Sequence, residues 1–172
     1  MSETDIPATL EGRSGHGVER RRGRSYLGGN PRAALERAQA RLLALSGAEV
    51  TRVRTNLGDG AIHHLEVGRG RPLVLLHGAG GGGANWYRLL KALGEERRVL
   101  APDLPGFGFS DPMPVHAPLG EHAARRVEAW LNANGLAACD AAGTSFGGLI
   151  AIRLAQRGCV ERLVLLDAAG LG

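Results

Sequence analysis

The sequence predicts an α/β fold, in which a mostly parallel sheet carries an antiparallel hairpin at its N-terminal side and helices on both faces. Short, wholly apolar segments such as Leu73–Leu76 are typical of strands buried on both faces of a parallel sheet. Segments with helical periodicity alternate with them along the chain. Upstream, residues 50–57 and 61–67 flank Gly58-Asp59-Gly60, which is the pattern of a β-hairpin. With 172 residues, of which 44% are hydrophobic, the chain can form one domain with its own core.

An amphipathic helix is expected to precede this domain. Asn30-Pro31 is a typical helix start, apolar residues then recur at helical spacing, and Gly47 ends the pattern. We therefore expect a disordered polar tail at residues 1–30, a helix at residues 31–47 and a partial α/β domain at residues 48–172. The remaining expected elements are strands at residues 72–77, 98–101, 139–142 and 163–166 and helices at residues 85–93, 119–134 and 148–156.

The charge of the chain does not indicate a nucleic-acid-binding protein. The net charge is +4, but Lys91 is the only lysine among the 21 basic residues, which points to a coding bias toward arginine. The densest basic segment, Arg20–Arg24, lies in the expected tail together with acidic residues, which favours a solvated tail over a nucleic-acid-binding arm. Aromatic residues make up only 4% of the chain, too few for a base-stacking surface.

Cysteine usage and hydropathy predict a cytoplasmic protein without membrane contact. Cys139 and Cys159 lie in largely apolar segments and lack the spacing of a metal site or a secreted disulfide framework. We expect small core residues in a reducing compartment, with a buried disulfide as the open alternative. No segment approaches the ~20 apolar residues of a membrane span, and the N-terminus lacks the apolar stretch of a signal peptide.

Ser145 is the candidate nucleophile. It is the centre of Gly143-Thr144-Ser145-Phe146-Gly147, a G-x-S-x-G pentapeptide between an expected strand and an expected helix. The flanking glycines leave room for a sharp bend, so the hydroxyl of Ser145 should stand exposed at the carboxyl end of the sheet. The backbone N–H of Phe146 should lie at the helix N-terminus, where it could bind an oxyanion. A glycine-rich turn with an incidental serine is the alternative interpretation.

A second candidate element is the glycine loop that follows His77 directly after a buried strand. Backbone N–H groups in such a loop can converge on an anion, which would make it the other half of an oxyanion hole. A dinucleotide loop is the alternative, because Gly78, Gly80 and Gly83 match G-x-G-x-x-G. The chain has no G-x-x-x-x-G-K-[ST] motif, and Asp103 fits the ribose-binding acid only loosely. The oxyanion interpretation is therefore favoured.

A third block, A-P-D-L-P-G-F-G-F-S-D at Ala101–Asp111, follows the next expected strand. By itself it is a Pro/Gly loop. In this order and spacing, however, the three blocks together resemble the α/β-hydrolase fold family over about residues 48–170. They are most similar to its esterase and carbon–carbon-bond hydrolase branch, the meta-cleavage-product hydrolases.

The resemblance implies a role for each matching position. Ser145 would be the nucleophile, and the backbone N–H groups of Ala79 and Phe146 would form the oxyanion hole. Asp167 occupies a position that supplies the catalytic acid in some branches, with a plain aspartate at a strand end as the alternative. The implied substrate is a small ester or other carbonyl compound.

The same resemblance implies that His77 shapes the oxyanion loop together with Gly78 and Gly80 and is not the catalytic base. Serine at position 145, where dehalogenases and epoxide hydrolases have aspartate, argues against their chemistry. Neither a metal nor an organic cofactor is expected.

The sequence departs from the family pattern in two ways. Thr144 stands where members often have histidine, and no histidine follows Ser145 although the family order is serine, acid, histidine. The lid and the last two strands are also missing from the expected elements. We therefore expect an incomplete, N-terminal portion of the fold, truncated and weak or inactive alone.

Two other classes of function stay open. The chain could be a non-catalytic scaffold or binding protein, or an enzyme completed by a partner chain that carries the histidine. An exposed sheet edge after the sixth strand would favour self-association.

Overall fold

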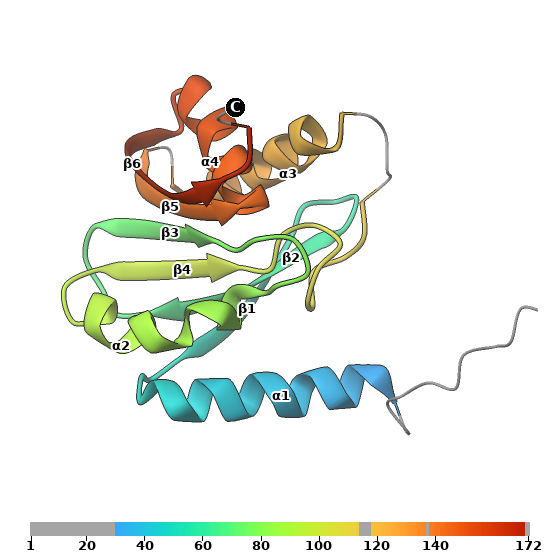
Figure 1. The fold of residues 1–172 in the computed structure, drawn as a ribbon, viewed down its shortest axis with the longest axis vertical. Coiled ribbons are helices and arrows are strands. Elements are labelled where there is room, and N and C mark those ends of the chain that lie inside the picture. The colour runs from blue at the N-terminus through green and yellow to red at the C-terminus, as the bar shows by residue number, and fades with distance from the viewer. Residues whose placement is uncertain (1–29, 114–117, 137, 171–172) are drawn as a thin grey trace, which may run out of the picture.

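A computed structural model describes residues 30–113, 118–136 and 138–170 of the chain (Figure 1). The predicted disordered tail, apart from Asn30, lies outside the described residues. The strands are β1 (Thr51–Asn56), β2 (Ala61–Val67), β3 (Pro72–Leu76), β4 (Arg98–Pro102), β5 (Cys139–Ser145) and β6 (Val160–Ala168). The helices are α1 (Pro31–Ser46), the 3-10 helix η1 (Gly83–Trp86), α2 (Tyr87–Gly94), α3 (Leu119–Ala133) and α4 (Phe146–Gln156).

The described strands form one mixed sheet in the order β1-β2-β4-β3-β5-β6. Strands β3, β4, β5 and β6 run parallel, while β2 pairs antiparallel with both β1 and β4. Helices α1 and α2 lie on one side of the sheet, and α3 and α4 lie on the other (Figure 1). The two sides have separate apolar clusters, one around Leu43, Leu65 and Leu90 and the other around Trp130 and Ile150. This arrangement confirms the predicted fold class, including the antiparallel hairpin.

Helix α1 begins and ends close to its predicted boundaries. The side chain of Asn30 accepts a hydrogen bond from the backbone N–H of Arg32 at 2.9 Å, and Gly47 ends the helix with a φ of 64°. An αL conformation at this position is least costly for glycine. Leu43 of this helix is buried in one apolar cluster with Leu65 and Leu90, so α1 packs on the domain.

Four other elements differ from the predicted boundaries by two residues or more. The helix predicted from residue 85 begins as the 3-10 turn η1 and continues as α2 from Tyr87, and β5 extends to Ser145 and not only to residue 142. Helix α4 begins at Phe146 and not at residue 148, and β6 extends over Val160–Ala168. Helix α4 follows β5 with no intervening loop. The glycines in its first turn have low helix propensity, which is why sequence patterns place its start too late.

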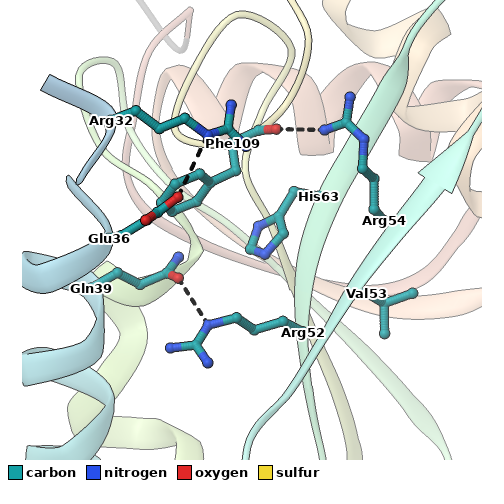
Figure 2. A pocket seen from close by; sticks show the side chains of 8 residues that line it. All are labelled: Arg32, Glu36, Gln39, Arg52, Val53, Arg54, His63 and Phe109. Carbon is teal, nitrogen blue, oxygen red and sulfur yellow. Dashed lines mark hydrogen bonds and ion pairs between the residues drawn. The ribbon is translucent and has the colours of Figure 1, made fainter. Parts of the chain in front are cut away.

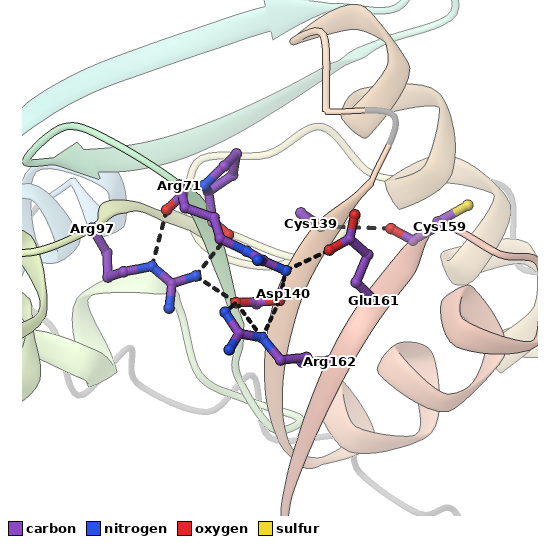
Figure 3. Close-up of polar contacts among 8 residues, drawn as sticks. Arg71, Arg97, Cys139, Asp140, Cys159, Glu161 and Arg162 are labelled. Carbon is purple, nitrogen blue, oxygen red and sulfur yellow. Dashed lines mark hydrogen bonds and ion pairs between the residues drawn. The ribbon is translucent and has the colours of Figure 1, made fainter.

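At the amino ends of the parallel strands, Asp140 binds three arginines (Figure 3). Nitrogen–oxygen distances are 3.0 Å to Arg71, 2.6 Å to Arg97 and 2.7 Å to Arg162. Hydrogen bonds from Arg162 and Arg97 hold the pKa of Asp140 well below its usual range. The cluster joins β5 and β6 to the segments that lead into β3 and β4, at the sheet end opposite Ser145.

Both cysteines are free thiols in this structure. Cys139 is buried, as expected for a core residue, whereas Cys159 is only partly buried. Within the described ranges, no helix is both long and apolar enough to cross a membrane.

His64 is a fully buried core histidine on β2. Its Nδ1 accepts a hydrogen bond from the indole N–H of Trp130 at 3.3 Å, and its Nε2 lies 3.6 Å from a carboxylate oxygen of Glu66. Burial outweighs the attraction of Glu66 and lowers the pKa of His64 to about 4. The ring is therefore neutral in the native protein at neutral pH.

This histidine should make the protein less stable in acid. The unfolded chain binds a proton at His64 near the ordinary pKa of 6.5, whereas the folded protein binds it only near 4. The contribution of His64 to the free energy of unfolding is therefore fully present above pH 6.5 and is lost as the pH falls toward 4. Because one pKa unit corresponds to about 1.4 kcal/mol, the loss from His64 approaches about 3 kcal/mol. Urea unfolding between pH 7 and pH 4 measures it. His64→Gln should reduce the slope and leave the contributions of His77 and of the carboxylates with a lowered pKa, such as Asp140, and an unchanged slope would contradict this assignment.

Candidate active site

Ser145 lies at the junction of β5 and α4 in a strained backbone conformation. Its φ is 48° and its ψ is −118°, a region that residues with side chains rarely occupy and that costs about 1–3 kcal/mol. The residue is exposed, and its hydroxyl neither caps α4 nor makes another hydrogen bond within the described residues. The hydroxyl is therefore free to meet a ligand at the positive end of the helix dipole.

Close packing of glycines holds this turn. A Cβ atom on Gly147 would collide with the backbone carbonyls of Leu76 and His77, and one on Gly143 would lie 2.5 Å from the carbonyl oxygen of Gly147. Only glycine permits α4 to approach the end of β3 this closely. The G-x-S-x-G pattern therefore has a steric cause on both sides of Ser145.

The glycine loop after β3 lies against Ser145. A Cβ atom on Gly78 would lie 3.3 Å from the Cβ atom of Ser145. The buried ring of His77 fixes the start of the loop, because its Nδ1 lies 2.7 Å from the carbonyl oxygen of Gly78 and its Nε2 accepts a hydrogen bond from the backbone N–H of Leu104 at 2.8 Å. Burial lowers the pKa of His77. Both ring nitrogens are engaged in these contacts, so the ring holds the start of the loop and is not available as a base.

Asp103 fixes the far end of the same loop. Its buried carboxylate accepts hydrogen bonds from the backbone N–H groups of Gly83 at 2.7 Å and Phe109 at 2.9 Å, and Nδ1 of His63 lies 3.0 Å away. Burial alone would raise the pKa of Asp103, but the bonds from His63, Phe109 and Gly83 hold it below its usual value. A carboxylate engaged in this way is not available for a ribose hydroxyl, which argues against the dinucleotide interpretation of the loop.

The other predicted oxyanion residues lie in the glycine loop and at the start of α4. Ala79 is exposed beside Gly78, and Gly80 takes a φ of 76° where the loop turns. Phe146 is the first residue of α4, so its N–H belongs to the group at a helix start that has no partner within the helix. Ala79 and Phe146 thus belong to the two segments that meet at Ser145.

Asp167 lies in the neighbouring strand, at an irregularity beside Ser145. Thr144 pairs with Leu166 but Ser145 pairs with Ala168, so Asp167 is the extra residue of a β-bulge. It is exposed and has a φ of 50°, the only positive φ besides Ser145 among the non-glycine residues that the structure describes. Two strained residues therefore adjoin each other at the carboxyl ends of β5 and β6.

No described histidine is hydrogen-bonded to Ser145. His63 binds Asp103, His64 is buried against Trp130, and His77 holds the glycine loop. His122 lies in α3, on another element, and His16 and His116 are outside the described residues. Within residues 30–113, 118–136 and 138–170, no group of three or more histidine, cysteine or acidic residues is arranged to hold a metal ion.

Comparison with known proteins identifies the family. The family profile described as alpha/beta hydrolase fold matches residues 71–169, which include the glycine loop, Ser145 and Asp167. The chain belongs to the alpha/beta hydrolase fold family. This confirms the resemblance inferred from the three sequence blocks.

Several hydrolases of this family are similar in sequence. The 2-hydroxy-6-oxo-2,4-heptadienoate hydrolase of Pseudomonas putida is 41% identical over 133 residues, covering 69% of this chain and 42% of that protein. A soluble epoxide hydrolase of Corynebacterium sp. is 33% identical over 121 residues, covering 69% of this chain and 43% of that protein. The chain thus spans less than half the length of these curated relatives.

Solved α/β-hydrolase structures superpose well on the described part. The 2-hydroxy-6-oxo-6-phenylhexa-2,4-dienoate hydrolase of Rhodococcus sp. matches with a TM-score of 0.67 and 27% identity, covering 73% of this chain and 48% of that one. A membrane phospholipase A, described as a bacterial virulence factor, matches with a TM-score of 0.70 and 33% identity, covering 81% of this chain and 46% of that one.

Sequence reasoning missed the role of Asp103. The sequence places it in the D-L-P-G block but gives no sign of its bond to His63, which is 40 positions away. Gly108 carries a usable signal, because a Cβ atom there would collide with the Asp103 carboxylate. An acidic residue followed by closely spaced glycines in a buried loop can indicate a carboxylate that binds the loop's own backbone.

Proposed function

We propose that this α/β-hydrolase chain supplies the nucleophile and oxyanion hole of a serine hydrolase that cleaves an ester or a carbon–carbon bond next to a carbonyl. The observation that carries the proposal is the strained, exposed Ser145 at the start of α4, against the glycine loop. Relatives named as hydrolases of 2-hydroxy-6-oxo-dienoates support the carbon–carbon alternative, and the phospholipase similarity supports the ester alternative. Serine at this position favours acyl chemistry over the epoxide opening named for another relative.

In the proposed reaction, Oγ of Ser145 attacks the substrate carbonyl carbon. The N–H groups of Ala79 and Phe146 bind the resulting oxyanion, the leaving group departs with a proton, and water then releases the acyl group from the serine. Asp167 is the proposed acid that orients a histidine, because it lies on the strand beside Ser145. No metal or organic cofactor takes part in this proposal.

A base must accept the proton of Ser145, and we propose that this base comes from outside the described residues. His63, His64 and His77 have other partners, which supports a base supplied by another part of the protein or by a partner chain. Loss of a triad member lowers turnover by several orders of magnitude. The chain alone should therefore be weak or inactive, and a non-catalytic scaffold is the competing function.

Hydrolysis of p-nitrophenyl acetate with and without added imidazole tests this proposal. Imidazole can replace a missing general base, so the wild-type chain should show an imidazole-dependent rate at least about tenfold above that of Ser145→Ala. Ser145→Ala measures the hydrolysis that imidazole performs in solution. If the hydrolysis rates of the wild type and of Ser145→Ala depend equally on imidazole, the result would favour a non-catalytic scaffold function.

We also propose that the chain acts in the cytoplasm and self-associates through β6. Strand β6 is the last strand of the described sheet, and Val164 and Leu166 are 54% and 44% exposed on it. An unpaired strand edge with apolar side chains favours pairing with a second copy. Sedimentation at increasing protein concentration should reveal a dimer that Val164→Lys weakens, and a monomer at all concentrations would contradict the pairing.

A further inference from the structure

A groove of about 460 Å³ lies between helix α1 and the hairpin of β1 and β2 (Figure 2). It is lined by Phe109 and by residues from α1, β1 and β2. In the sheet order, β4 and β3 separate β2 from β5, so three strand spacings of about 4.8 Å place the groove roughly 14 Å from Ser145. The groove is therefore separate from the candidate active site.

His63 presents a ring nitrogen to this groove. Its side chain is only 10% exposed, and Nδ1 lies 3.0 Å from Oδ2 of Asp103, whose side chain is 1% exposed. A carboxylate accepts, so Nδ1 carries the hydrogen and Nε2 offers its lone pair. No partner for Nε2 exists within the described residues. Figure 2 shows the ring between Phe109 and the side chains of Arg52 and Arg54.

Arg52 brings an uncompensated positive charge to the same groove. Arg54 is paired with Asp111 at 2.7 Å, and Arg32 lies 3.5 Å from Glu36. Arg52, in contrast, donates only from Nε to the amide oxygen of Gln39, at 3.2 Å. Within the described residues, its two terminal nitrogens have no acceptor. Such a planar pair of donors fits the two oxygens of a carboxylate or phosphate.

We propose that this groove binds a small organic oxyanion that also carries a hydroxyl group, such as a hydroxycarboxylate or a phosphate monoester. The oxyanion binds the guanidinium of Arg52, and the hydroxyl donates its hydrogen to Nε2 of His63. Phe109 provides an apolar wall beside these two polar groups. Most of the residues that line the groove are polar or charged, which suits a small polar ligand, and the volume of the groove lies within the usual range for a small-molecule site.

Lactate, propionate and inorganic phosphate are the probes that test this site. Titration of each into the wild-type chain, followed by the NMR signals of the His63 ring, measures binding. Lactate should shift these signals saturably and bind about fivefold more tightly than propionate, which lacks only the hydroxyl. Saturation by phosphate but not by lactate would assign the site to phosphate esters. No saturable shift with either lactate or phosphate would overturn the proposal.

Matched arginine variants separate this site from general attraction of anions. Arg52→Gln should weaken lactate or phosphate binding at least about tenfold, because it removes a charge-assisted pair of hydrogen bonds. Arg88→Gln removes the same charge from α2, where the guanidinium of Arg88 binds Tyr87, and should change affinity less than about twofold. Equal weakening in both variants would overturn the proposal.

Discussion

Replacing Gly147 with alanine is expected to lower the free energy of unfolding by at least about 3 kcal/mol, a large share of the stability of a small domain. The added methyl group would collide with the backbone carbonyls of Leu76 and His77. Those carbonyls belong to the end of β3 and the start of the glycine loop, so relief of the collision must move α4 and Ser145 away from the loop. Urea unfolding of the wild type and the variant measures the loss.

Gly158→Ala is the matched control at the other end of α4. Gly158 has a φ of 76° but nothing within 4 Å of an added Cβ atom, so the substitution should cost only the backbone strain of about 1 kcal/mol. We expect a clearly larger loss in the free energy of unfolding for Gly147→Ala than for Gly158→Ala. Equal losses for the two variants would show that contact with β3 does not hold the turn.

Asp103→Asn is expected to cost about 3 kcal/mol and to disturb the glycine loop. The two carboxylate oxygens of Asp103 accept hydrogen bonds from His63, Gly83 and Phe109 in a site with almost no solvent access. Asparagine retains one acceptor and directs an amide donor at one of these donors, so a buried hydrogen bond is lost and a donor is left unpaired. Urea unfolding should show the loss, and NMR signals of Gly83 should move.

Asp111→Asn provides the comparison within the same block. The side chain of Asp111 is 40% exposed and binds Arg54 and the backbone N–H of Ala61. Because solvent weakens this pair, we expect a clearly smaller loss in the free energy of unfolding than for Asp103→Asn. If both asparagine variants cost the same, the three bonds to Asp103 would not be what fixes the loop.

Local sequence patterns were sufficient to predict the order of strands and helices and the turn at Ser145. Short apolar segments, helical periodicity and glycine spacing are all encoded within a few positions, and the structure contains the expected hairpin, parallel strands and strand–helix junction. The glycine loop and Ser145 are 67 positions apart, yet their contact was expected because parallel strands bring their carboxyl ends to one edge of the sheet.

Contacts that depend on which strands become neighbours could not be predicted in this way. The bond between His63 and Asp103 joins β2 to the loop after β4, and the cluster around Asp140 brings together Arg71, Arg97 and Arg162 from three segments. The bulge that places Asp167 beside Ser145 arises from the register of β5 and β6. Each of these contacts depends on which strands pair in three dimensions. The type of a single residue does not indicate that pairing.

The most direct test of the central claim, that Ser145 is a nucleophile, is labelling by a fluorophosphonate followed by mass spectrometry of the modified peptide. We expect one phosphonyl group per folded chain, attached to Ser145, and none on the Ser145→Ala variant. Imidazole should speed the reaction because it supplies the missing base. Absence of labelling in the folded wild-type chain even with imidazole, or equal labelling of Ser145→Ala, would contradict the claim.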